Sequence, residues 1–215
     1  MTVNRRNQQL ALGTLGLFGI LAILVKIQFA PLMALDRQWL GGFQTSWLGQ
    51  HVRLWDWLTT LGSPAITGGF AVLLALFLWQ IHQRGWSLTV LTAIIGGDAL
   101  LLVIKQLVSR IRPTQQVVAD SGFSFPSGHV FSTMLVACIV ATLLFRFLKG
   151  NWLFWTILAV IAIGVLGVVL ARLGLRDHFP SDALGSLLLA SGWWLQVLSL
   201  YERLQGKHQA TKVLE

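Results

Sequence analysis

Long apolar runs recur along this chain, and they constrain its fold more than any other feature of the sequence. A helix of roughly 20 apolar residues is long enough to cross the hydrocarbon core of a bilayer. Hydrophobic residues make up 55% of the 215 residues, a share too high for one soluble core with a wetted surface. The sequence therefore predicts an all-α fold, a six-transmembrane helix bundle in a single integral-membrane domain (residues 1–215), with spans at Leu10–Val25, Ile66–Ile81, Ser87–Ile104, His129–Phe147, Leu153–Ala171 and Asp182–Leu200.

The start of the chain combines Arg5 and Arg6 with the first apolar run. This pattern also suits a secretory signal peptide. No clear small-residue cleavage site follows Lys26, so a retained first span is the better interpretation.

The connection between the first two spans, Phe29–Ser63, is the longest in the chain. It mixes large rings such as Trp39, Trp47 and Trp57 with charged side chains. That mixture is typical of helices that lie in the head-group layer of a membrane. We therefore expect interfacial amphipathic helices between the first and second spans.

The formal net charge of +8 at pH 7 raises the alternative of nucleic-acid binding. The basic residues are scattered between the spans, however, and do not cluster on one soluble face. Attraction to anionic lipid head groups is the simpler interpretation. The expected partners are the lipid bilayer and a membrane lipid, with no nucleic acid.

A dense polar run, Arg172–Asp182, separates the last two spans. His178 and Asp182 stand four residues apart, so they share a face if the chain turns helically there. A carboxylate in that position would hold the imidazole in one tautomer and raise its basicity. Arg172 and Arg176 would attract an anion to the same place. The alternative is a polar loop with incidental charges.

Two further polar runs lie on the same predicted side of the membrane. Lys105 and Arg112 are about two helical turns apart, so both can point the same way at the end of a span. The run Pro126–His129 opens the fourth span, where free backbone N–H groups and Gly128 would form a cradle for an oxyanion or phosphate. Taken singly, these runs also suit a snorkelling Lys/Arg pair and a capped helix start. Their occurrence on one face of one bundle favours a functional site.

The orientation of the bundle depends on what these basic residues do. With the N-terminus inside, the 16 basic residues divide equally between the two sides of the membrane, so the positive-inside rule alone gives no answer. Part of the far-side set lies in polar runs beside histidine, namely Lys105, Arg110, Arg112, Arg172 and Arg176. If those residues hold a ligand, the remaining charges predict cytoplasmic N- and C-termini and a site on the extracytoplasmic side.

The three runs resemble the motifs of a known family, the type 2 phosphatidic acid phosphatases of the wider acid phosphatase and vanadium haloperoxidase superfamily. The family signature is Lys, six residues, Arg-Pro; then Pro-Ser-Gly-His; then Ser-Arg, five residues, His, three residues, Asp. In this sequence it stands as Lys105…Arg112-Pro113, Pro126-Ser127-Gly128-His129 and Ala171-Arg172…His178…Asp182. Only Ala171 departs from the signature, because the family has a serine hydroxyl at this position.

The resemblance implies a metal-independent lipid phosphate phosphatase that uses no cofactor and forms a phosphohistidine. His178 would be the nucleophile, Asp182 would orient its imidazole, and His129 would act as general acid and then general base. The nonbridging oxygens of the phosphate would be held by Lys105, Arg112, Arg172, Ser127 and the Gly128 amide.

A site at the mouth of the bundle favours a substrate whose phosphate already lies in the head-group layer. The expected substrates are undecaprenyl diphosphate, phosphatidylglycerol phosphate, phosphatidic acid or another lipid phosphate. Two alternatives stay open: a phosphotransferase acting on a second lipid, and a non-catalytic lipid-phosphate transporter or binding protein. The second alternative has no need of a His178–Asp182 pair. The compact form with short loops is typical of bacterial members, and the sequence leaves the oligomeric state open.

Overall fold

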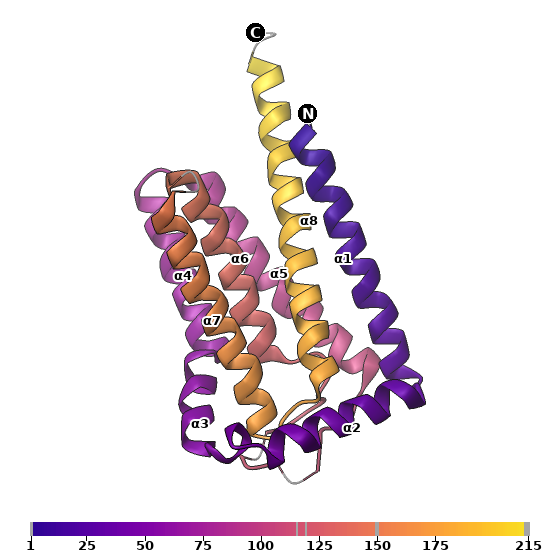
Figure 1. Cartoon of the computed structure of the whole chain (residues 1–215). Helices are drawn as coiled ribbons and strands as arrows, with labels where there is room; N and C mark the ends of the chain where they lie inside the picture. Colours follow the sequence, from indigo (N-terminus) through magenta and orange to yellow (C-terminus); the bar gives the residue numbers. More distant parts are fainter. Residues whose placement is uncertain (1, 115, 119, 149–150, 213–215) are drawn as a thin grey trace.

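The computed structural model describes residues 2–114, 116–118, 120–148 and 151–212, and every regular element in these ranges is a helix. Figure 1 shows the long helices standing side by side, with α2 lying across one end of the bundle. Six stretches are long and apolar enough to cross a membrane, which confirms the predicted fold class. In chain order the helices are α1 (Thr2–Lys26), α2 (Ala30–Thr45), η1 (Leu48–Gln50), α3 (Val52–Leu61), α4 (Pro64–Gln80), α5 (Arg84–Val108), α6 (Gly128–Leu148), α7 (Trp152–Gly174) and α8 (Pro180–Lys212).

The helices at the two ends of the chain extend beyond the predicted spans. α8 continues past Leu200 as a polar helix, where it runs beside the start of α1. The Asn7 side-chain amide donates to Glu202 at 3.2 Å, and Arg203 donates to Gln8. These polar contacts explain why the helix does not stop where its apolar run stops.

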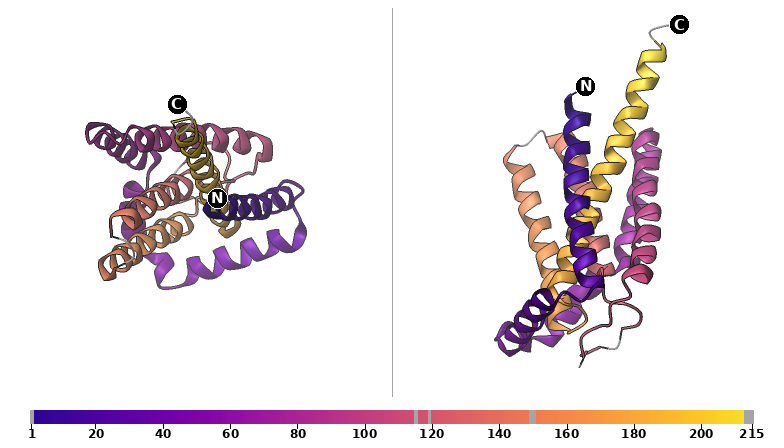
Figure 2. Two further views of the ribbon diagram at one scale, coloured as in Figure 1. Left: turned by 90° about the horizontal axis from the view of Figure 1, so that it is seen from above. Right: turned by 90° about the vertical axis from the view of Figure 1, so that its right-hand side faces the viewer.

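The core lies around α8, which packs against α1, α5 and α6 and runs through the middle of the bundle in the view from above (Figure 2). Phe125, from the polar stretch after α5, is fully buried in this core. A Cβ atom on Gly185 would lie only 2.6 Å from the Phe125 ring. The glycine therefore lets the polar stretch dock closely on α8.

The connection between the first two spans forms the helices α2, η1 and α3, as the aromatic and charged composition predicts. On α2, Asp36 and Leu40 are buried while Leu35 and Trp39 are exposed, so the helix is amphipathic. One expectation needs correction. Only two residues separate α3 from α4, and the second candidate span runs over 52–80 rather than beginning at Ile66.

Both chain ends lie at the same end of the bundle in Figure 1. The stretch between α5 and α6 and the turn between α7 and α8 lie at the opposite end, beside α2. The three polar runs are therefore gathered at one end of the molecule, away from the termini.

Candidate active site

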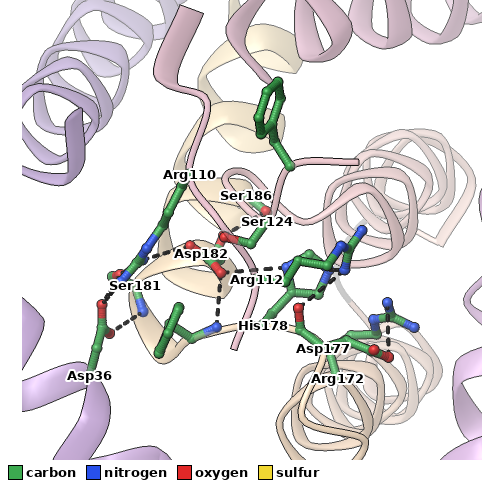
Figure 3. Close-up of polar contacts among 12 residues, drawn as sticks. Asp36, Arg110, Arg112, Ser124, Arg172, Asp177, His178, Ser181, Asp182 and Ser186 are labelled. Carbon is green, nitrogen blue, oxygen red and sulfur yellow. Dashed lines mark hydrogen bonds and ion pairs between the residues drawn. The ribbon is translucent and has the colours of Figure 1, made fainter. Parts of the chain in front are cut away.

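Segments that are far apart in the sequence meet at the end of the bundle beside α2 (Figure 3). They are the stretch 109–127, the first turn of α6 and the turn 175–179. Ser127, Arg172 and Asp182 are buried there. The other predicted site residues line one cavity of about 360 Å³, namely Lys105, Arg112, Gly128, His129 and His178.

The imidazole of His178 is 1% exposed, and its two nitrogens face different partners. Nδ1 lies 3.5 Å from Oδ2 of Asp182, and Nε2 lies 3.2 Å from Nη1 of Arg112. The Asp182 carboxylate is itself held at both oxygens. Oδ2 accepts from the Phe179 N–H at 2.8 Å, and Oδ1 accepts from Nη1 of Arg110 at 2.7 Å. Nε2 is thus the nitrogen on the side of Arg112, one of the cations predicted to hold a phosphate.

The spacing predicted that His178 and Asp182 share one helical face, but the structure holds the pair in a different way. α8 begins at Pro180, so His178 precedes the helix and Asp182 lies in its first turn. By accepting the Phe179 N–H, Asp182 satisfies a free donor at the helix start, and the same carboxylate faces the imidazole. Burial lowers the pKa of His178 to about 4, although Asp182 opposes this shift. The imidazole is therefore neutral at pH 7, and with its proton on Nδ1, beside Asp182, it keeps a lone pair on Nε2, where Arg112 lies at 3.2 Å.

Arg112 and Arg172 share one carboxylate, that of Asp120. Its Oδ2 lies 2.7 Å from Nη2 of Arg172 and 3.1 Å from Nη2 of Arg112. Burial alone would raise the pKa of Asp120, but the two guanidinium charges outweigh burial and hold this pKa below its usual range. Arg172 also donates to Oγ1 of Thr59 at 2.9 Å and lies 3.1 Å from Oδ2 of Asp177. The Asp120 carboxylate thereby holds the guanidinium groups of Arg112 and Arg172 together.

Lys105 and Arg112 reach the cavity by a different route from the predicted one. α5 ends at Val108, and Ser109 takes a left-handed conformation with φ 55°, so the two residues do not share a helix. The chain then folds back, and Nζ of Lys105 donates to the Phe123 carbonyl at 2.7 Å. Both side chains still line the cavity.

Within the described ranges, the buried side-chain nitrogen and oxygen atoms without a hydrogen-bond partner are Ser127 Oγ, Arg172 Nε and His178 Nδ1. Such an atom costs about 1–3 kcal/mol of stability, and native proteins contain few of them. All of these atoms belong to residues predicted for the site. The described part of the chain thus concentrates its unsatisfied polar atoms where a polar ligand is expected.

Sequence reasoning missed several residues at this site and misplaced one. Asp120 and Asp177 had no motif signal, and Gln116, whose amide donates to Asp177 at 2.9 Å, had none either. Arg110 was visible only as one more charge in a basic run. Arg176, expected to attract an anion together with Arg172, takes φ 60° and does not line the cavity.

The positive charge at the site comes from arginine and lysine. Over the described ranges, no group of at least three His, Cys, Asp or Glu side chains is placed to hold a metal ion. The donor set that faces the cavity is rich in cations, which suits an anionic ligand.

Comparison with known proteins shows the family to which the chain belongs. A family model described as the PAP2 superfamily matches residues 86–205, more than half of the chain. The chain belongs to the PAP2 superfamily. The matched region of this PAP2 protein runs from α5 into α8, so it holds every motif residue but none of α1–α4.

Two proteins from Bacillus subtilis are similar to this PAP2 protein. It is 30% identical over 138 residues to phosphatidylglycerophosphatase B of strain 168, covering 61% of this chain and 66% of that protein, just under two thirds. Its fold is similar to that in the crystal structure of a transmembrane PAP2 type phosphatidylglycerolphosphate phosphatase, with a TM-score of 0.77. The two sequences are 22% identical, and the match covers 90% of this chain and 96% of that one. At this identity, the second likeness shows the membrane-spanning fold alone.

Proposed function

We propose that this PAP2 protein is a lipid phosphate phosphatase that passes the phosphoryl group first to His178 and then to water. The observation that carries the proposal is that buried Ser127 Oγ and Arg172 Nε have no hydrogen-bond partner, in a site where the guanidinium groups of Arg112 and Arg172 already hold the Asp120 carboxylate between them. A phosphate in that place would give the Ser127 and Arg172 atoms partners and would lie on the Nε2 side of His178, whose Nδ1 faces Asp182. Phosphoryl transfer gains most from positioning and charge neutralisation of this kind.

In the first step, Nε2 of the neutral His178 attacks phosphorus, and the bond between phosphorus and the leaving oxygen breaks. The imidazole becomes a cation that carries the phosphoryl group, and the Asp182 carboxylate beside Nδ1 stabilises this charge. His129 lines the same cavity and donates a proton to the leaving alkoxide or phosphate.

In the second step, water attacks the phosphorus of the phosphohistidine. His129, which is now unprotonated, accepts a proton from that water. The phosphorus–nitrogen bond breaks, inorganic phosphate leaves, and His178 is neutral again. Lys105, Arg112 and Arg172 neutralise the nonbridging oxygens throughout, together with Ser127 and the Gly128 amide, so no metal ion or cofactor is required.

The proposed substrates are lipids whose phosphate lies in the head-group layer, with the cavity facing the extracytoplasmic side and both termini in the cytoplasm. Phosphatidylglycerol phosphate comes first, because a curated relative is named as a phosphatidylglycerophosphatase. Undecaprenyl diphosphate and phosphatidic acid also end in a terminal phosphate and are the other proposed substrates.

Release of inorganic phosphate by the purified protein tests this function. We expect release from phosphatidylglycerol phosphate, phosphatidic acid or undecaprenyl diphosphate in mixed micelles, at a rate that excess chelator does not change. Folded protein that releases phosphate from none of these lipids would contradict the proposal. If chelator abolishes release and one divalent ion restores it, the metal-free mechanism is wrong.

Replacing Asp120 with asparagine should tighten the binding of phosphate. The Asp120 carboxylate bridges Arg112 and Arg172, so it competes with any phosphate that these cations bind, whereas a neutral amide of the same size would compete less. We expect the inhibition constant of inorganic phosphate to fall about tenfold, equivalent to about 1.4 kcal/mol. Competitive inhibition assays measure this constant, and an unchanged or higher value would show that Asp120 does not compete with phosphate.

A further inference from the structure

The carboxylate of Asp36, on α2, is buried at the start of α8. Asp36 is 2% exposed, although it belongs to a helix whose other face carries exposed apolar side chains. Its Oδ1 accepts from the Ser181 N–H at 2.9 Å, and its Oδ2 accepts from the Ser181 hydroxyl at 2.5 Å. A carboxylate at a helix N-terminus is stabilised by the free N–H groups there. Asp36 therefore fixes the first turn of α8 from outside that helix.

Arg110 connects this carboxylate to the one beside the nucleophile. Nη2 of Arg110 lies 2.6 Å from Oδ2 of Asp36, and Nη1 lies 2.7 Å from Oδ1 of Asp182. Nη1 also donates to the Ser181 hydroxyl at 2.7 Å, and the Phe179 ring lies 4.1 Å from the guanidinium carbon. Figure 3 shows Arg110 between Asp36 and Asp182.

Arg110 lies outside the lining of the proposed phosphate cavity. It does not line the cavity that holds Lys105, Arg112 and both imidazoles, and its donors are directed to Asp36, Ser181 and Asp182. Breaking a buried ion pair leaves an uncompensated charge and is costly. Asp36, Arg110 and Asp182 therefore hold one another in place as one buried group of charges.

We infer that Asp36 and Arg110 are positioning residues that hold Asp182 in the orientation that activates His178. Without Arg110, Oδ1 of Asp182 loses its charged partner, and the carboxylate is free to rotate away from the imidazole. Without Asp36, Arg110 has Asp182 as its remaining carboxylate partner, neutralises it more fully, and weakens its support of the imidazolium formed during phosphoryl transfer. This inference rests on the proposed function and extends its machinery to α2.

The test compares Asp36→Asn, Arg110→Gln and the double variant with the wild-type chain, all in the same micelles. The key measurement is the single-turnover rate at which the phosphoryl group becomes protein-bound in an acid-labile, base-stable form. Loss of the hydrogen-bond partners of metal ligands costs about 10–100-fold; taking the same range for the partners of a catalytic carboxylate, we expect about tenfold for Asp36→Asn and about a hundredfold for Arg110→Gln. KM and inhibition by inorganic phosphate should stay within about threefold of wild type, because the cavity is unchanged.

The double variant distinguishes one connected unit from two separate effects. If Asp36 acts through Arg110, the double variant should be no slower than Arg110→Gln alone. Multiplied losses would overturn the connection, and so would an Asp36→Asn rate within twofold of wild type. The matched control is Asp56→Asn, the same change at an exposed position of α3, which should retain the wild-type rate.

Two further arms keep the result unambiguous. If Asp36→Asn does not fold, Ser181→Ala removes the hydroxyl shared by Asp36 and Arg110 and keeps both charges. It should slow phosphoryl transfer about threefold with KM unchanged, and a wild-type rate would overturn the inference. A wild-type chain that releases no phosphate defeats the proposed function itself, whereas an active wild type with an equally active Asp36→Asn defeats this inference alone.

Discussion

Replacing His178 with alanine is expected to abolish phosphate release while the protein still binds its lipid. Nε2 of this imidazole is the nitrogen that faces Arg112, and no other side chain in the proposed mechanism forms the bond to phosphorus. Loss of a catalytic nucleophile can cost on the order of 10⁶-fold in kcat. Phosphate release and lipid binding, measured on the same purified variant, check the result.

The chain offers a matched control in His82→Asn. His82 is exposed in the turn between α4 and α5, and asparagine tolerates its positive φ of 63°. This variant should keep the wild-type rate. Undiminished phosphate release by His178→Ala would remove its assignment as nucleophile and would indicate a different catalytic mechanism.

The second large effect is expected for Asp182→Asn. An asparagine amide offers a donor where the carboxylate offers an acceptor, so it would favour the imidazole tautomer that carries its proton on Nε2. That tautomer has no lone pair for attack on phosphorus. Arg110 and the Phe179 N–H would also lose a charged acceptor. The equivalent change in a serine protease triad lowers kcat about 10⁴-fold, and we expect a loss of about 10³–10⁴-fold here.

Steady-state assays on Asp182→Asn should show the loss in kcat, with KM changed little because the phosphate-binding cations stay in place. Ser186→Ala serves as the control, because its buried hydroxyl donates to the backbone carbonyl of Asp182 and not to the carboxylate. Full turnover by Asp182→Asn would show that the carboxylate does not set the tautomer.

The motif residues could be predicted to converge because their spacing places each of them at the end of an apolar span. The order of spans then brings Lys105, His129 and His178 to one face of the bundle. How each motif side chain reaches the site depends on the local backbone conformation, which the motif spacing does not predict. The left-handed turn at Ser109 takes Arg112 off the helix, and the start of α8 at Pro180 separates His178 from the helical turn that holds Asp182.

The contacts that join distant segments could not be predicted at all. Asp120 lies in a polar stretch with no periodicity, so nothing in its neighbours indicates that it bridges two arginines. Asp36 was one acidic residue in an amphipathic segment, where a solvated position is the ordinary expectation. Its burial depends on the partners Arg110 and Ser181, which are remote in the chain.

The burial of Asp36 also changes what counts as the smallest working unit of this protein. Family recognition begins at residue 86, and a chain cut to that region would retain every motif residue. It would lack α2, and Arg110 would be left with half of its anionic contacts. Under the proposed role of Asp36, helix α2 is part of the catalyst as well as a means of holding it in the bilayer.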